Sequence, residues 1–204
     1  YEEDAYCSHI KKLEAENFYR WNLSLYRSAA GLHESTPWYA TNYDDNNWQT
    51  VNMFSQSWGN NGLNPIGGSL WLRQDIEIPQ SWNGKEATLR LGCIVDADSV
   101  YVNGVLVGTT SYQYPPRIYR IPAGILKSGK NNITVRIISN GGQPGFVQEK
   151  PYKIICDNEE INLKQKWKYR LGAHMPPAPE MMFFWYKPVC LYNAMIAPLQ
   201  NYSI

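Results

Sequence analysis

The sequence of 204 residues is poor in the features that mark membrane, nucleic-acid-binding and metal-binding proteins. No apolar run approaches the length of a membrane span and no signal peptide opens the chain, so no membrane partner is expected. The net charge is +1 and no block of basic residues occurs, which argues against nucleic acid as the main partner. The four cysteines are far apart and form no Cys-x-x-Cys pair, which leaves zinc and thioredoxin-like sites without support.

The sequence also offers few candidates for the nucleophile and base that ester hydrolysis requires. A serine triad needs a serine, a base within hydrogen-bond reach and an acid that orients the base. The chain holds three histidines, His9, His33 and His174, and it lacks the Gly-x-Ser-x-Gly motif of a nucleophile elbow. We therefore expect no catalytic residue here, and we expect His174 to be structural or solvent-facing.

Aromatic residues, by contrast, are abundant. They make up 14% of the chain and include 8 Trp and 15 Tyr. Such side chains favour β-strands, and their flat rings also stack on the C–H groups of sugars. Most of these rings are expected in a core, and a few remain as candidates for a carbohydrate-binding surface.

Alternating apolar residues predict an antiparallel β-sandwich or jelly roll. Residues 99–102 and 105–107 form a predicted hairpin, because Asn103-Gly104 tolerates the positive φ angles of a type I′ turn. Ile133, Val135 and Ile137 would share one face of another strand, with Thr134 and Arg136 on the opposite face. Further strands are expected in residues 70–78, 87–93, 117–121 and 152–156.

Changes in composition divide the chain into three segments. Residues 1–31 are predicted to be helical, because Tyr6, Ile10, Leu13, Trp21 and Leu25 recur mainly at spacings of three or four, and Gly31 suits the end of a helix. Residues 32–158 hold the strands and turns of the sandwich. Residues 159–204 form an irregular connector with one further candidate strand at 167–170, and their apolar tail is expected to meet a neighbouring domain that is missing from this chain.

Two sets of motifs resemble known families. The first resembles the sugar-binding jelly roll of family-two glycoside hydrolases, which has the galactose-binding-like fold. Its motifs are Tyr43-Asp44-Asp45-x-x-Trp48, Gly68-Ser-Leu-Trp71-x-Arg73, Asp96-x-Asp98-x-Val-Tyr-Val-Asn-Gly104-x-x-Val-Gly108 and Leu126-x-x-Gly129-x-Asn131-x-Ile-x-Val135. The second set resembles sialate O-acetylesterases. Its motifs are Pro116-Arg117-x-Tyr119, Trp167-Lys-Tyr-Arg-Leu-Gly-Ala-His-Met-Pro-Pro177 and Lys187-Pro-x-x-Leu-Tyr-Asn-Ala-Met-Ile-Ala-Pro-Leu199.

The second resemblance implies a β-sandwich inserted into a hydrolase domain of the SGNH type, with that catalytic domain of the same parent chain as its partner. The parent would remove O-acetyl esters from sialic acids, and a secreted, periplasmic or lysosomal location is expected from the family. The family's catalytic motifs lie upstream of the insert and beyond residue 204, so this chain alone is expected to be inactive. The alternative is a free-standing carbohydrate-binding module of a glycoside hydrolase.

Loops at one end of the predicted sandwich supply the candidate ligand-binding residues Trp58, Tyr112, Tyr114 and Arg117. Their rings would stack on a sugar, and Arg117 would bind a carboxylate, such as that of sialic acid, through two hydrogen bonds. The alternative is that the rings pack within the loop and Arg117 forms a buried ion pair.

Two pairs of aspartates are candidates for other chemistry. Asp44 and Asp45 are candidate ligands of a structural calcium ion, which takes several oxygen ligands, and the alternative is a turn. No other cofactor is expected. Asp96 and Asp98 would share one face of a strand, and a glycosidase-like role would require one of them to have a raised pKa in a cleft. The alternative is that they close the loop before the hairpin.

Overall fold

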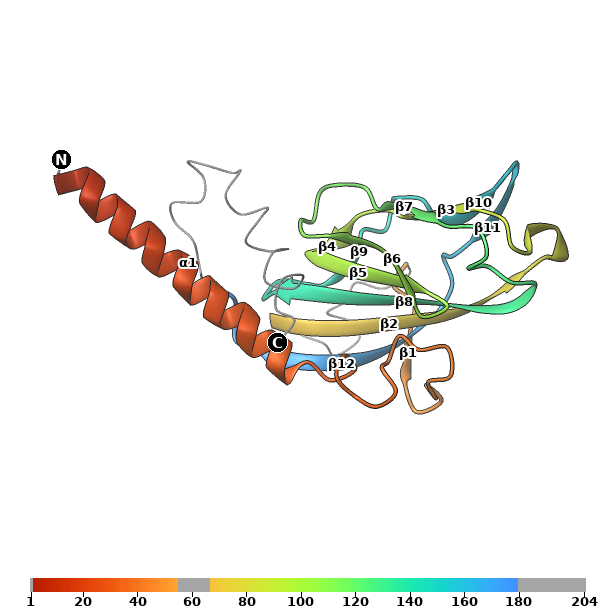
Figure 1. Ribbon diagram of the computed structural model, residues 1–204, viewed down its shortest axis with the longest axis horizontal. Helices are drawn as coiled ribbons and strands as arrows, with labels where there is room; N and C mark the ends of the chain where they lie inside the picture. Colours follow the sequence, from red (N-terminus) through yellow and green to blue (C-terminus); the bar gives the residue numbers. More distant parts are fainter. Residues whose placement is uncertain (1, 55–66, 180–204) are drawn as a thin grey trace.

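The computed structural model describes residues 2–54 and 67–179, which form an antiparallel β-sandwich preceded by a long helix (Figure 1). The predicted mainly β fold is confirmed, as is the N-terminal helix, α1 (Glu2–Ser28). A short 3₁₀ helix, η2, covers Gln80–Trp82. The strands are β1 (Gln49–Val51), β2 (Gly67–Ile78), β3 (Ala87–Leu91), β4 (Ile94–Val95), β5 (Ala97–Val102), β6 (Val105–Thr110), β7 (Ile118–Ile121), β8 (Gly129–Asn140), β9 (Gly145–Phe146), β10 (Tyr152–Cys156), β11 (Glu159–Asn162) and β12 (Trp167–Met175).

Two antiparallel sheets face each other. The larger has the strand order β1-β12-β2-β8-β5-β6, the smaller has the order β11-β10-β3-β7, and β4 pairs with β9 in a short separate ladder. The two 12-residue strands β2 and β8 pair along their whole length and form the centre of the larger sheet. Strands β11 and β12 complete the sheets, so the sandwich extends past residue 158.

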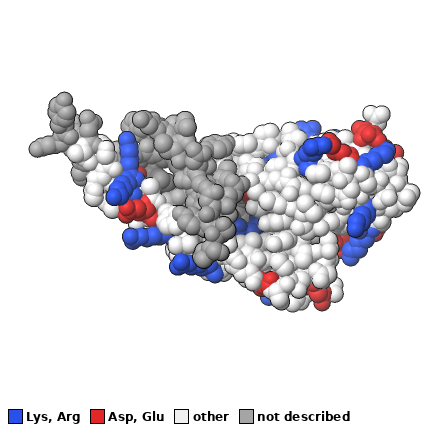
Figure 2. All heavy atoms as spheres, in the orientation of Figure 1, with Lys and Arg blue, Asp and Glu red and all other residues white. Residues whose placement is uncertain are grey.

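Charged side chains are sparse on one face of the molecule (Figure 2). On the face shown in Figure 2, blue and red side chains lie singly or in small mixed groups and form no single-sign patch. Within the described ranges, no helix combines the length and the apolar character needed to cross a membrane.

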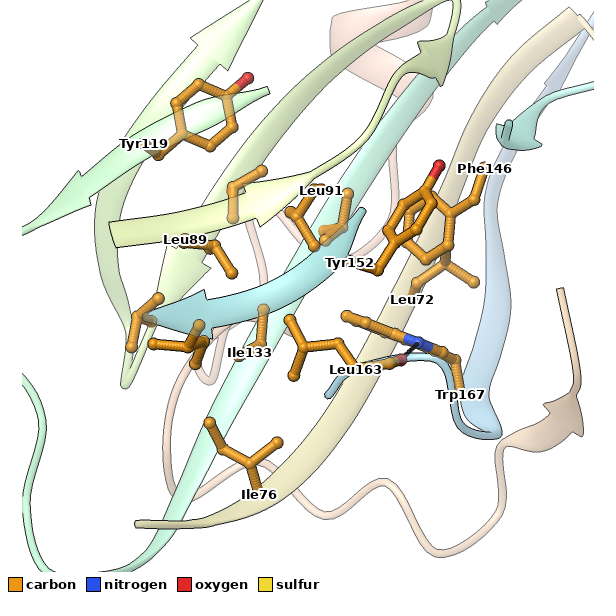
Figure 3. Packing of buried hydrophobic residues seen from close by; sticks show 14 of the residues in the cluster. Leu72, Ile76, Leu89, Leu91, Tyr119, Ile133, Phe146, Tyr152, Leu163 and Trp167 are labelled. Carbon is orange, nitrogen blue, oxygen red and sulfur yellow. Dashed lines mark hydrogen bonds between the residues drawn. The ribbon is translucent and has the colours of Figure 1, made fainter. Parts of the chain in front are cut away.

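The main core lies between the sheets, because each strand turns alternate apolar side chains inward. Ile133, Val135 and Ile137 of β8 are completely buried there, as predicted. In Figure 3, Ile133 shares this core with Leu89, Leu91 and Tyr152 of the smaller sheet. Trp167 of β12 lies in the same core, and its Nε1 donates a hydrogen bond of 3.2 Å to the carbonyl oxygen of Leu163. Each fully buried side chain of this size stabilises the fold by about 1.5–3 kcal/mol.

The β5–β6 hairpin turns at the predicted Asn103-Gly104, whose φ angles are +48° and +81°. Nδ2 of Asn103 donates hydrogen bonds to the carbonyl oxygen of Ile125 (2.8 Å) and to Oδ1 of Asn131 (2.7 Å), which ties the turn to the loop before β8. The returning strand β6 forms the edge of the larger sheet, and β7 forms the edge of the smaller one. Residues 111–117 connect these two edges.

The outer face of the larger sheet is covered by the N-terminal part of the chain. In the second half of α1, Trp21 and Leu25 are buried against Ile138 of β8 and Ala173 of β12. The helix ends before Gly31, which has a φ of +88°. The first half of α1 extends away from the sheets (Figure 1), and Leu13 is 41% exposed. The apolar stripe predicted for the helix is therefore buried against the sheet only toward its C-terminal end.

Candidate functional site

Arg117 lies beneath the loop that joins β6 to β7. Its side chain is fully buried, and its Nε donates to Oδ1 of Asp98 over 2.6 Å. Its Nη1 donates to the carbonyl oxygens of Gln113 (3.2 Å) and Pro115 (2.8 Å), and its Nη2 donates to that of Asp96 (3.0 Å). Because these donors bind groups of the domain itself and the side chain has no exposed surface, the structure places Arg117 in a buried ion pair. Its contact with a ligand stays a prediction.

Asp98 is the acceptor at the centre of this network. It also accepts a hydrogen bond of 2.6 Å from the hydroxyl of Tyr119, which in turn lies 2.7 Å from Oγ1 of Thr110. Burial raises the pKa of Asp98 against the opposing effects of Arg117 and Tyr119. Burial and the neighbouring Asp98 carboxylate likewise raise the pKa of Tyr119, so its hydroxyl stays protonated and donates. The network joins β5, β6 and β7.

Asp96 has a similar internal role. Its Oδ2 accepts the backbone N–H of Asn140 at 2.9 Å, and burial raises the pKa of Asp96. Asp96 and Asp98 therefore fasten the start of β5 to neighbouring segments, as the alternative for this pair anticipates.

Tyr112 and Tyr114 point outward from the loop that Arg117 supports. They are 41% and 67% exposed, and their rings lie 5.0 Å apart at 74°. The carbonyl groups bound by Arg117 belong to the residues on either side of Tyr114, and Sγ of Cys93 donates a further hydrogen bond, of 3.2 Å, to the Tyr114 carbonyl oxygen. We call Tyr112 and Tyr114 the tyrosine pair. Trp58, the remaining candidate for this site, lies outside the described residues.

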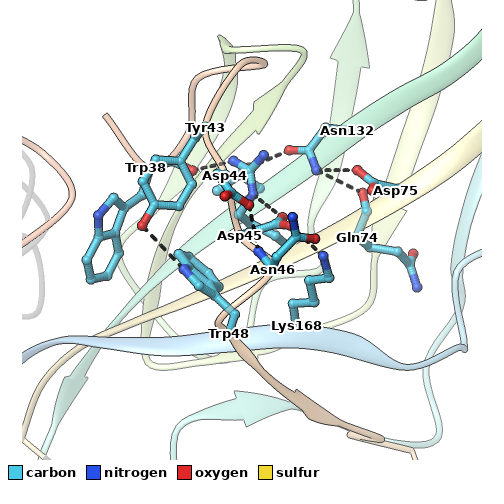
Figure 4. Close-up of polar contacts among 12 residues, drawn as sticks. Trp38, Tyr43, Asp44, Asp45, Asn46, Trp48, Gln74, Asp75, Asn132 and Lys168 are labelled. Carbon is cyan, nitrogen blue, oxygen red and sulfur yellow. Dashed lines mark hydrogen bonds and ion pairs between the residues drawn. The ribbon is translucent and has the colours of Figure 1, made fainter. Parts of the chain in front are cut away.

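Asp44 and Asp45 lie in residues 37–48, which cross the outer face of the larger sheet and which we call the strap (Figure 4). Oδ1 of Asp44 accepts the backbone N–H of Asn46 at 3.0 Å and closes a turn. Asp45 forms ion pairs with Arg73 of β2, at 2.8 Å, and with Lys168 of β12. The strap is thus joined to the sheet through a carboxylate held between two cations.

The same contacts determine the pKa of Asp45. Burial opposes its ionisation, but the hydrogen bonds from Lys168 and Arg73 outweigh burial and hold its pKa below the ordinary value of 3.8. A polar cavity of about 250 Å³ lies beside it, lined also by Asp75, which pairs with Lys130 at 2.9 Å. No cluster of three or more His, Cys, Asp or Glu residues that could hold a metal occurs within residues 2–54 and 67–179. A calcium ion at Asp45 would have to displace Arg73 and Lys168, and it stays a prediction.

Aromatic side chains anchor the rest of the strap. Trp38 and Trp48 are buried against Trp71 of β2, with the Trp38 ring 5.2 Å from Trp48 and 6.0 Å from Trp71. Arg73 also donates to the carbonyl oxygen of Trp38 and, over 3.1 Å, to Oγ1 of Thr134. The Tyr-Asp-Asp-x-x-Trp motif therefore builds the covering of the sheet.

A second cavity, which the sequence did not reveal as a site, lies between α1 and the outer face of β5, β6 and β8. It has a volume of about 180 Å³ and includes Arg136, which is 2% exposed. The sequence places Arg136 between the apolar residues Val135 and Ile137 of β8. This position alone does not tell whether the guanidinium has an ion-pair or hydrogen-bond partner on the covered face of the sheet.

The three histidines lie elsewhere. His9, His33 and His174 are all exposed, in accord with the solvent-facing role expected for His174. Two of the four cysteines, Cys93 and Cys156, are buried free thiols.

Comparison with known proteins finds no matching family model and no matching curated protein. Part of the chain is similar to solved bacterial β-glucuronidases. The one from Ruminococcus gnavus is 18% identical, with a TM-score of 0.35 over 52% of this chain and 20% of that chain. The one from Bifidobacterium dentium is 24% identical, with a TM-score of 0.35 over 40% and 14% of the two chains. The one from Faecalibacterium prausnitzii is 20% identical, with a TM-score of 0.32 over 37% and 13%. The chain thus spans a fifth or less of these proteins, and the partial matches identify no family.

Proposed function

We propose that this β-sandwich is a non-catalytic, carbohydrate-binding accessory domain of a carbohydrate-active hydrolase. The observation that carries the proposal is the tyrosine pair, two exposed rings on a loop whose carbonyl groups are fixed by the fully buried Arg117. Rings held in place before binding lose little conformational freedom when a sugar stacks on them. Arg117 acts in this proposal as the support of the loop.

Two parents are compatible with such a domain. In the first, it is a carbohydrate-binding module of a glycoside hydrolase, and sugar binding at the tyrosine pair is its own activity. In the second, it is inserted into the SGNH-type catalytic domain of a sialate O-acetylesterase-like protein that acts on sialylated glycans in a secreted, periplasmic or lysosomal location. The sequence motifs favour this second parent, and there the domain supports the catalytic domain or orients its substrate.

One structural observation favours insertion. The chain enters and leaves the sandwich at the same place, because the backbone N–H of Ala30 donates to the carbonyl oxygen of Gly172 at 2.9 Å. Nε1 of Trp21 likewise donates to the carbonyl oxygen of Pro176 at 2.8 Å. A domain whose two connections are adjacent can occupy a loop of a host domain without separating the ends of that loop.

Glycan binding by the chain tests the proposal. On an array of neutral and sialylated glycans, followed by calorimetry, we expect a dissociation constant of about 0.1–10 mM for at least one glycan. The double substitution Tyr112→Ala/Tyr114→Ala should weaken binding at least about tenfold, because it removes the stacking rings. Ile118→Ala is the matched control, since Ile118 is 53% exposed on the adjacent strand β7.

Two outcomes would count against the proposal. Binding that the tyrosine substitutions leave unchanged would remove the tyrosine pair from the site. A chain that binds no glycan would contradict a carbohydrate-binding domain in either parent.

A further inference from the structure

The cavity under α1 is bounded by the helix on one side and by the larger sheet on the other. Phe18 and Tyr26 of α1 form one wall, and Tyr101 of β5 and Ile138 of β8 form part of the other. Most of its lining surface is apolar, although polar side chains such as Asn22, Ser99 and Thr109 also contribute to it. A cavity of about 180 Å³ with such walls suits the body of a small, largely apolar molecule.

Two charged residues line this cavity, Asp98 and Arg136. Asp98 is already paired with Arg117, whereas Arg136 differs from the other buried arginines. Arg73 and Arg117 pair with Asp45 and Asp98. Within the described part of the chain, Nε and Nη2 of Arg136 have no hydrogen-bond partner, although the side chain is only 2% exposed. A buried charge without a partner is destabilising, so an unused guanidinium in a cavity indicates a binding group.

The surroundings of Arg136 leave its charge in place. Its guanidinium carbon lies 5.9 Å from the centre of the Trp71 ring, a cation–π contact that offsets part of the unfavourable burial. Burial lowers the pKa of Arg136 to about 10, and the nearby hydroxyls of Tyr101 and Tyr26 oppose that change. The side chain is therefore still a cation at neutral pH.

We propose that this cavity binds a small organic monocarboxylate with an apolar body, whose carboxylate pairs with the guanidinium of Arg136. The planar guanidinium matches the two oxygens of a carboxylate, and its adjacent Nε and Nη2 are the donors without partners. Both atoms are buried in the free chain, so the ligand would meet them after a rotation of the Arg136 side chain toward the cavity. Apolar side chains such as Phe18 and Ile138 would hold the body of the ligand. This binding is independent of sugar stacking at the tyrosine pair.

Single-ring probes test the proposal on the full chain. Binding of benzoate and phenylacetate, and of the neutral benzyl alcohol, is measured by calorimetry and by NMR titration. We expect wild-type protein to bind at least one carboxylate at least about tenfold more tightly than the alcohol, since only the carboxylate pairs with Arg136. This comparison needs no variant.

Arg136→Met should abolish the preference for carboxylates. Its matched control is Arg120→Gln, which changes an exposed arginine of β7 and should leave the preference intact. Arg136→Met should also unfold at the same temperature as the wild type or a higher one, because it removes an unpaired buried charge.

Three results would overturn the proposal. They are a wild-type chain that binds neither carboxylate at concentrations of about 10 mM, equal binding of carboxylate and alcohol, and an Arg136→Met protein that keeps the carboxylate preference.

Discussion

At the scale of single residues, the partners of the buried arginines decide what each arginine does. Arg73 and Arg117 each meet an aspartate from a distant part of the chain, 28 and 19 residues away, and become part of the scaffold. Arg136 meets the ring of Trp71 and the edge of a cavity. Arg73 and Arg136 lie within strands of alternating apolar residues, and Arg117 directly precedes one. Their different roles could not be predicted, because the sequence does not state which aspartate reaches which strand.

The Asp98–Arg117 pair supports the first prediction at this scale. Arg117→Met should lower the free energy of unfolding by about 3–5 kcal/mol, because it leaves Asp98 buried without its cation. The double variant Arg117→Met/Asp98→Asn should be less destabilised than the sum of its two single variants, since it removes both charges. Urea denaturation measures these differences. Arg120→Met, in an exposed ion pair, should stay near wild type, and additive single effects would argue against a coupled pair.

At the scale of elements, the strap shows how a short motif organises one face of a sheet. Turns were predicted for this region, and the turn at Asp44 is present. The ion pairs of Asp45 with β2 and β12 could not be predicted, because they connect residues 28 and 123 positions apart in the sequence. Trp38 and Trp48 of the strap cover Trp71, so the strap shields this part of the sheet from solvent.

The strap should make stability depend on pH. The pKa of Asp45 is lowered in the folded state, so its contribution is complete above the ordinary value near 3.8 and is lost as the pH falls through the folded-state value. Asp45→Asn should therefore lower the free energy of unfolding by about 3 kcal/mol at pH 7, because it leaves the buried Arg73 without its charge partner. The difference from wild type should shrink below about pH 3.8. Denaturation at several pH values checks this.

The matched control is Asp157→Asn, since Asp157 pairs with Lys85 in an exposed salt bridge. It should have little effect at any pH. A constant difference between Asp45→Asn and wild type across the pH range would contradict the ion-pair account.

The alternation of apolar and polar residues predicted the strands whose pairing is regular. It did not predict the part of a strand that lies beyond a register shift. The strand expected at residues 167–170 continues to Met175 as β12. A register shift between Leu171 and Ala173 breaks the alternation there, which hides the second half of the strand. The three-residue β1 is too short to show any period.

At the scale of the whole molecule, stability should be uneven. The central strands β2 and β8 are covered on both faces, whereas residues 5–16 of α1 extend from the body (Figure 1). In hydrogen exchange followed by mass spectrometry, the amides of β2 and β8 should exchange slowest and those of residues 5–16 far faster. The second half of α1, anchored by Trp21 and Leu25, serves as the internal control. Equal protection of both halves would show that the helix unfolds as one unit with the sheet.

The β6 edge of the larger sheet has a consequence for self-assembly. Edge strands of natural proteins often contain lysine, proline or a β-bulge, which hinders pairing with a strand of another molecule. The outermost residues of this edge, Val-Leu-Val-Gly-Thr-Thr, contain neither lysine nor proline, although a register shift against β5 leaves Val107 as an extra residue. Before that irregularity, Val105 and Leu106 are 47% and 52% exposed. At high protein concentration, copies of this chain should therefore associate by pairing through β6. A charged substitution at Val105, which does not line the cavity under α1, should reduce this association.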